Sequence, residues 1–214
     1  MPHLICRPSK GYGSRGRYPV DFVVLHYTWG SKAGDLATLT SRQASSHFYI
    51  TNNGDIYWLV RLNNSAYHAG INRVLAPKRW ARIKPNERSV GIEIEGYGRY
   101  TEEQYRALEW CLPIILKRFN IPLAFLPNPY RGCDPKAKAD RYEIEALEEF
   151  RGILAHGNVH ASKVDPGLDF DWDRIKCLEL LPDPGCLGRA ERAVYLDEPD
   201  FVPKEGLPYE FHEL

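Results

Sequence analysis

The sequence predicts an α/β fold: a single domain with a mixed central β-sheet flanked by helices. Two short apolar runs, at 21–26 and 152–156, each end in a histidine and are typical of strands buried on both faces. Helical patterns alternate with such runs, which favours parallel strand pairing. A hairpin at 46–60 adds antiparallel pairing, so the expected sheet is mixed.

The elements of the first half follow from local patterns. Residues 7–19 are rich in Gly, Arg and Tyr and predict an irregular basic arm. A short helix is expected at 35–42. The turn residues Asn-Asn-Gly-Asp at 52–55 separate two apolar runs and so predict the hairpin. A basic loop at 71–88 then leads into a buried strand at 89–94.

The second half begins with a clear helix. Thr101 and Gln104 have the spacing of a capping box, and Pro113 is expected to kink the helix. Four prolines make 121–138 an irregular segment. The further expected elements are helices at 140–150 and 172–181, a loop at 157–170 and an extended tail from 182.

Charge divides the chain into three parts. Residues 1–20 carry four basic residues and no acid, whereas 189–214 carry seven acids and three bases. We therefore expect a basic N-terminal arm at 1–20, the folded domain at 21–181 with an insertion at 121–150, and an acidic extension at 182–214.

The composition excludes some classes of partner. The chain has 28 basic and 28 acidic residues, so no net field draws it to nucleic acid or to an anionic membrane. No apolar run approaches the roughly 18 residues of a membrane span. The N-terminus shows no charged segment followed by a long apolar stretch, so no signal peptide is expected.

Two histidines and one aspartate form a candidate metal site. His26 and His156 end the two apolar runs, and Asp165 follows in a loop closed by Pro-Gly. Two imidazoles and one carboxylate leave a fourth position open for water, which is typical of catalytic zinc. The alternative is two hydrogen-bonded core histidines, and the spacing alone favours neither.

Glu93 favours a catalytic site. A carboxylate among apolar residues in mid-strand costs free energy unless it is paired or functional, and beside zinc it could act as a general base. The alternative, an acid facing solvent, suits Glu95 better than Glu93. Lys163 could stabilise an oxyanion near the metal, although a lone lysine is more often a surface residue.

Six blocks of sequence, in order along the chain, carry a family resemblance. They span about Asp21 to Arg174 and comprise 23–28, 45–57, 66–70 (Ala-Tyr-His-Ala-Gly), 89–93 (Ser-Val-Gly-Ile-Glu), 153–156 and 163–172. They resemble the type-2 zinc N-acetylmuramoyl-L-alanine amidases, which include phage T7-lysozyme-like endolysins, the cytosolic muropeptide-recycling amidase and the peptidoglycan recognition proteins.

The resemblance implies roles for particular residues. One zinc ion per chain would be bound by His26, His156 and Asp165 in a surface groove at the edge of the sheet. Glu93 falls where the recycling-type enzymes keep their catalytic acid. Lys163 falls on the lysine that assists the tetrahedral intermediate.

The resemblance also points to the substrate pocket. His68 matches a substrate-pocket position, and we expect Tyr27 and Trp29 to contribute to substrate binding. Ser46 stands where the T7-type enzymes have a catalytic tyrosine, which favours Glu93 as the base. The stretch from 156 to 165 is one residue shorter than the common form and contains His160, a competing candidate ligand.

The implied activity is hydrolysis of the amide bond between N-acetylmuramic acid and L-alanine in peptidoglycan. We expect a monomeric, bacteriolytic and antimicrobial endolysin, made in the bacterial cytoplasm without a signal peptide and acting on the cell wall after release. The alternatives are a cytosolic muropeptide-recycling amidase, a non-catalytic peptidoglycan recognition module, and a zinc hydrolase of another bond.

Overall fold

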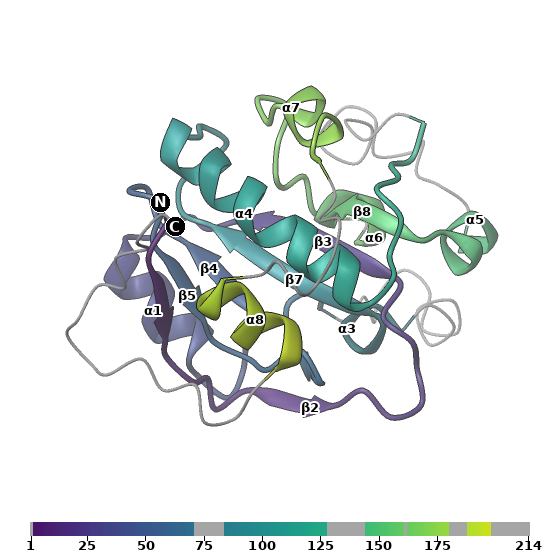
Figure 1. The fold of residues 1–214 in the computed structure, drawn as a ribbon, viewed down its shortest axis with the longest axis horizontal. Coiled ribbons are helices and arrows are strands. Elements are labelled where there is room, and N and C mark those ends of the chain that lie inside the picture. Colours follow the sequence, from purple (N-terminus) through teal and green to yellow (C-terminus); the bar gives the residue numbers. More distant parts are fainter. Residues whose placement is uncertain (1, 71–83, 128–143, 161, 180–187, 198–214) are drawn as a thin grey trace.

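A six-stranded sheet runs through the middle of the computed structural model, which describes residues 2–70, 84–127, 144–160, 162–179 and 188–197 (Figure 1). The strands lie in the order β1-β5-β4-β7-β3-β8. Their bounds are β1 Leu4–Cys6, β3 Phe22–Tyr27, β4 Phe48–Ile50, β5 Ile56–Trp58, β7 Ser89–Ile94 and β8 Gly152–Ala155. The α/β class and the mixed sheet are confirmed.

The pairing places three strand ends side by side. β3 is parallel to both β7 and β8, and β4 is parallel to β7. β4 and β5 form the predicted antiparallel hairpin. Two further strands, β2 (Tyr12–Ser14) and β6 (Asn64–Ala66), make a separate antiparallel pair.

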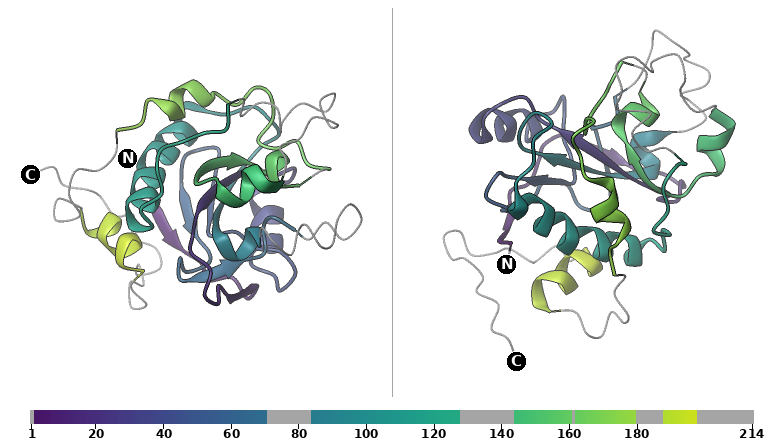
Figure 2. Two further views of the ribbon diagram at one scale, coloured as in Figure 1. Left: turned by 90° about the vertical axis from the view of Figure 1, so that its right-hand side faces the viewer. Right: turned by 90° about the horizontal axis from the view of Figure 1, so that it is seen from above.

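Helices cover both faces of the sheet (Figures 1 and 2). On one face α4 (Glu102–Arg118) and α8 (Arg189–Leu196) join the largest apolar cluster. On the other face α1 (Lys32–Leu39) packs with the side chains of Tyr49 and Tyr57. The shorter helices are α3 Pro85–Arg88, α5 Ile144–Glu149, α6 His156–Val159 and α7 Trp172–Lys176.

Alternation along the strands divides apolar from polar groups. Val23 and Leu25 of β3 face the cluster under α4, as does Ile92 of β7. The intervening residues His26 and Glu93 therefore point to the opposite face, since successive side chains alternate. The register pairs His26 with Glu93 across β3 and β7.

The predicted capping box of α4 is present. The Thr101 hydroxyl accepts a hydrogen bond from the Gln104 backbone N–H, and the Gln104 side chain accepts one from the Thr101 N–H. The helix continues through Pro113. The other helices depart from expectation at their ends: α1 begins at Lys32, and α7 ends at Lys176.

The N-terminal segment differs from the expected irregular arm. Within the predicted arm at 7–19, Tyr12–Ser14 form β2, which pairs with β6, and the residues before the arm form the edge strand β1, which pairs with β5. Arg15 is buried, and its guanidinium donates to the backbone carbonyls of Leu62, Glu87 and Ser89. These three carbonyls provide partners that let the charge be buried.

The C-terminal extension also differs from the expected extended tail. Ala190 and Val194 of α8 belong to the core beneath α4. The Asp197 carboxylate accepts hydrogen bonds from the backbone N–H groups of Leu62 and Asn63. The sequence-based elements at 71–83, 128–143 and 198–214 lie outside the described residues.

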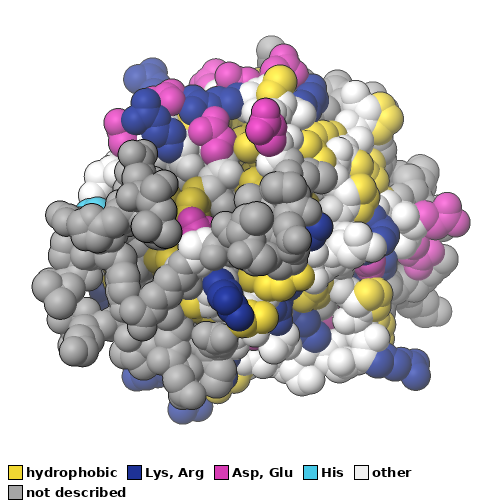
Figure 3. All heavy atoms as spheres, viewed as in Figure 1, with side chains coloured by type: hydrophobic (Ala, Val, Ile, Leu, Met, Phe, Trp, Pro, Cys, Tyr) yellow, Lys and Arg dark blue, Asp and Glu magenta, His cyan; other side chains and the backbone are white. Residues whose placement is uncertain are grey.

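Charged side chains on the α4 face are paired. Basic and acidic groups lie next to one another over α4 and α7 at the top of Figure 3. Arg174 of α7 contacts Glu102 and Glu109 of α4.

In the part of the chain that the structure describes, no helix has both the length and the apolar character needed to cross a bilayer.

We predict that α8 contributes to stability. Val194 is fully buried, so Val194→Ala should lower the free energy of unfolding by about 2 kcal/mol, measured by urea denaturation. Arg192→Ala, on the exposed side of the same helix, is the control and should change it by less than about 0.5 kcal/mol. Equal effects of the two variants would contradict the packing of α8 on the core.

Candidate metal centre and pocket

Three side chains converge where β3 and β8 end. His26 lies on β3, His156 follows β8 directly, and Asp165 lies in the loop beyond α6. His26 Nδ1 is 2.9 Å from His156 Nδ1 and 3.1 Å from Asp165 Oδ2, and the third side of the triangle is 2.9 Å. All three residues are buried.

This triangle fits a small metal ion. Zinc bonds of about 2.0–2.1 Å in a tetrahedral site place neighbouring donor atoms about 3.3 Å apart, so a slight spreading of the three atoms would accommodate the ion. Among the described residues, these three form the one cluster of His, Cys, Asp or Glu able to hold a metal. His160 is not part of it.

The outer nitrogen of each imidazole faces a second partner. His26 Nε2 lies 2.9 Å from His68 Nδ1, and His156 Nε2 lies 3.4 Å from the carbonyl oxygen of Ala69. Both inner nitrogens thus point into the triangle. A ligating histidine is commonly oriented by such an outer contact.

The pKa shifts at the site favour unprotonated side chains, which are the forms that bind a metal ion. Burial, together with the neighbouring His156, lowers the pKa of His26 to about 4. Burial also lowers the pKa of His68 well below its usual range. Burial alone would raise the pKa of Asp165, but His156 and His26 outweigh it and hold that pKa below its ordinary value. The site therefore presents a neutral imidazole at His26 and a carboxylate at Asp165 at neutral pH.

Glu93 lies beside this centre on β7. Burial, reinforced by the charge of Asp165, raises the pKa of the Glu93 carboxyl group well above its ordinary value. Glu95 does not face solvent as the sequence suggested: it is buried, and its carboxylate accepts a hydrogen bond from the Asn52 N–H. Of the two, Glu93 is thus the carboxylate that lies in the same pocket as the metal-site residues His156 and Asp165.

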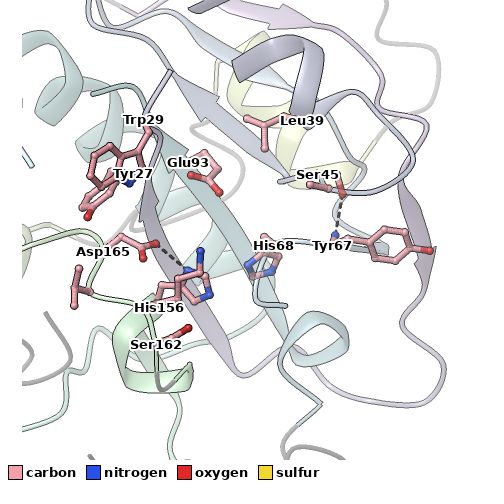
Figure 4. Close-up of a pocket in the computed structure, with 13 residues that line it drawn as sticks. Tyr27, Trp29, Leu39, Ser45, Tyr67, His68, Glu93, His156, Ser162 and Asp165 are labelled. Atoms are coloured by element: carbon pink, nitrogen blue, oxygen red, sulfur yellow. Dashed lines mark hydrogen bonds and ion pairs between the residues drawn. The ribbon is translucent and has the colours of Figure 1, made fainter. Parts of the chain in front are cut away.

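Two of the three donors, His156 and Asp165, line a pocket of about 380 Å³ together with Glu93 (Figure 4). All of the residues expected to bind substrate, namely Tyr27, Trp29 and His68, line it as well, as does Lys163. Tyr27 and Trp29 stand at one side in Figure 4, and Tyr67 stands at the other.

An aromatic group forms the rim beside Tyr27. Trp29 is 74% exposed, and its ring centroid lies 3.6 Å from that of Tyr97, which is 55% exposed. Tyr27 contacts Tyr97 with ring centroids 5.0 Å apart. Large apolar rings this exposed at the mouth of a pocket indicate a contact surface for a ligand.

Several neighbours of the pocket could not be read from the sequence. Tyr97 follows a strand end in a Gly-rich segment, where only its aromatic character could have suggested a role. Asp35 is buried and accepts hydrogen bonds from Thr28 and Tyr49.

Ser46 stands where the resemblance places a tyrosine in the T7-type enzymes. It is buried and donates to the Phe48 carbonyl, and it is not among the residues that line the pocket.

Comparison with known proteins decides the family. Residues 16–168, more than half of the chain, match the Amidase_2 family, described as N-acetylmuramoyl-L-alanine amidase. The chain belongs to this amidase family. The predicted superfamily is thereby confirmed, although the match does not distinguish a phage endolysin from other members.

Individual amidases are similar over much of the chain. The 1,6-anhydro-N-acetylmuramyl-L-alanine amidase AmpD of Haemophilus influenzae is 29% identical over 64% of this chain. The N-acetylmuramoyl-L-alanine amidase AmiD of Escherichia coli is 30% identical over 76% of it. The matched regions span 60% and 54% of the lengths of these two relatives.

A solved structure supports the shared fold. The complex of AmiD from E. coli with anhydro-N-acetylmuramic acid-L-Ala-D-gamma-Glu-L-Lys aligns with a TM-score of 0.53 at 24% identity. The alignment covers 79% of this chain and 62% of that one.

We predict that Glu93 destabilises the metal-free fold. Its folded-state pKa is raised, so ionisation above the unfolded-state pKa, near 4.5, costs stability at pH 7 but not at pH 4. Glu93→Gln should therefore raise the free energy of unfolding of the metal-free protein by about 1 kcal/mol or more at pH 7, and the gain should vanish near pH 4.

Urea denaturation at both pH values measures this effect. Glu95→Gln is the matched control and should give no gain, because the Glu95 carboxylate already accepts a hydrogen bond from Asn52. A loss of stability in Glu93→Gln at pH 7, or a gain independent of pH, would contradict the electrostatic account of the site.

Proposed function

We propose that this protein hydrolyses the amide bond between N-acetylmuramic acid and L-alanine in peptidoglycan, using zinc held by His26, His156 and Asp165. The observation that carries the proposal is the converging triangle of three donors, two of which line the same pocket as Glu93. Membership of the amidase family supports it, as do the names of the relatives AmpD and AmiD.

The donor set suits zinc and leaves room for catalysis. Two imidazoles and one carboxylate would hold the ion and leave a fourth position for a water molecule, as in catalytic zinc sites. When bound, the ion would polarise the scissile carbonyl and lower the pKa of a water molecule. His26 and His156 would bind through Nδ1, since these atoms face one another across the triangle.

Glu93 is suited to move the proton. A raised pKa brings a carboxyl group closer to working pH, so that it can accept a proton from the attacking water and pass it to the leaving amine of L-alanine. Lys163 lines the same pocket, and its ammonium group would stabilise the negative charge that develops on the carbonyl oxygen. All these groups come from one chain, so we propose that a monomer is sufficient.

Tyr27 and Trp29, together with Tyr97, would bind the substrate at the rim. Their uncharged faces suit the apolar face of a sugar ring better than the carboxylates of a stem peptide. Both ring nitrogens of His68 are engaged within the protein, so we do not propose substrate binding as its main role.

Two kinds of substrate are compatible with this proposal: soluble muropeptides and the intact cell wall. The AmpD name specifies a 1,6-anhydro-muramyl amidase, which favours soluble muropeptides. Action on the intact wall corresponds to the bacteriolytic endolysin role that we expected from the sequence, with release of the enzyme from the cytoplasm. A recognition module without activity would bind the same material and leave it uncut.

The proposal is tested by product analysis on two substrates. The zinc-loaded protein is incubated with purified sacculi and with anhydro-muropeptides, and mass spectrometry follows the release of stem peptides beginning with L-alanine. We expect Glu93→Gln to retain zinc and lose about 10²–10⁴-fold in kcat, and Asp165→Ala to lose zinc. Glu103→Gln, which changes an exposed carboxylate on α4, should match wild type.

The pattern of products separates the alternatives. Cleavage of sacculi supports the wall-degrading role, and cleavage of anhydro-muropeptides alone supports recycling. Binding without cleavage by the zinc-loaded wild type, or cleavage of a different bond, would overturn the proposed activity.

A further inference from the structure

One short segment of the chain contacts the outer side of both histidine ligands. His68 Nδ1 meets His26 Nε2 at 2.9 Å, and the carbonyl oxygen of the next residue, Ala69, meets His156 Nε2 at 3.4 Å. Histidines far apart in sequence are thus oriented by two adjacent residues. We propose that the segment His68–Ala69 sets the orientation of both ligands, with His68 as a positioning residue for His26.

The hydrogen bonds around His68 can run in only one direction once His26 binds a metal. A His26 ring that ligates through Nδ1 carries its proton on Nε2 and donates it towards His68 Nδ1. A neutral His68 that accepts at Nδ1 must be protonated on Nε2, and this N–H donates to Ser89 Oγ at 3.1 Å. The Ser89 hydroxyl donates in turn to the Pro85 carbonyl.

This series of hydrogen bonds therefore ends on the Pro85 carbonyl, an acceptor that fixes the direction of the whole series. A backbone carbonyl has no proton to give, so the Ser89 hydroxyl must donate to Pro85 and leave its lone pairs for His68. This relay fixes the proton of His26 on Nε2 and keeps the Nδ1 lone pair of His26 directed at the metal position. Ser89 is fully buried, so water does not compete for these contacts.

The surroundings leave space for the His68 ring. A Cβ atom at Gly91 would overlap this ring, so the absence of a side chain on β7 lets the imidazole lie against the strand. The backbone of Gly91 does not have a positive φ, so the requirement at this position is space. The Ala69 N–H donates to the Asn86 side chain at 2.9 Å, which holds the segment in place.

This inference rests on the metal site of the proposed function and changes the role expected for His68. The sequence resemblance placed His68 among the substrate-binding residues, and its ring does line the pocket wall. Both of its nitrogens are engaged inside the protein, however, so its main effect should be on metal affinity rather than on KM.

Zinc affinity, measured by competition with a chromogenic chelator, tests the role directly. His68→Phe keeps a flat ring but has no acceptor, and we expect zinc to bind about 10- to 100-fold more weakly. His68→Asn places Oδ1 near the position of Nδ1 and should recover most of the lost affinity. His3→Phe, which changes an exposed histidine, is the matched control and should bind zinc like wild type.

A second measurement needs no variant and remains decisive if His68→Phe fails to fold. Long-range ¹H–¹⁵N spectra of the zinc-loaded wild type should show His26 and His68 both protonated on Nε2. Wild-type affinity in a folded His68→Phe, or a His68 ring protonated on Nδ1, would overturn the proposal. A protein that binds zinc in this way but cleaves neither sacculi nor anhydro-muropeptides would overturn the proposed activity and leave the positioning role intact.

Discussion

The register between β3 and its two parallel neighbours is the constraint on which the site depends. It aligns His26 with Glu93 on β7 and places His156 directly after the end of β8. A slip of β3 by one residue would turn His26 towards the apolar cluster under α4 and away from Glu93. The hydrophobic residues that alternate with them, Val23, Leu25 and Ile92, hold the register and so also hold the chemistry in place.

Side chains of the same chemical type differ in pKa and in hydrogen-bond partners because their surroundings in the site differ. Contact with His156 and His26 holds the pKa of Asp165 below its ordinary value, whereas burial and the nearby charge of Asp165 raise the pKa of Glu93. His26 and His156 present Nδ1 to the centre because their outer nitrogens are engaged by His68 and Ala69. In the proposed mechanism, residues of the same type act as ligand, base or positioning group because their surroundings differ.

Local sequence signals predicted the parts of the fold that depend on local chemistry. The Asn-Gly turn predicted the hairpin of β4 and β5, and Thr101 with Gln104 predicted the start of α4. Apolar runs ending in histidine predicted a site that includes His26 and His156, and the loop after His156, closed by Pro-Gly, supplied Asp165 as the third candidate.

Features that depend on distant contacts were missed. Arg15 is charged yet buried, because its partners are carbonyls from residues 47 to 74 positions away. The helix α8 packs on the core through Ala190 and Val194, in a segment whose acidic charge led us to expect an extended tail. The role inferred for His68 depends on which ring nitrogen carries a proton, and only the positions of His26 and Ser89 reveal that.

X-ray absorption at the zinc edge tests the central claim most directly. The account predicts one zinc ion per chain with four nitrogen or oxygen donors at about 2.0–2.1 Å, two of them imidazoles. The Asp165→Ala variant should show a changed or missing zinc signal. A third imidazole, a sulfur donor at about 2.3 Å, or a zinc environment unchanged by loss of Asp165 would contradict the site formed by His26, His156 and Asp165.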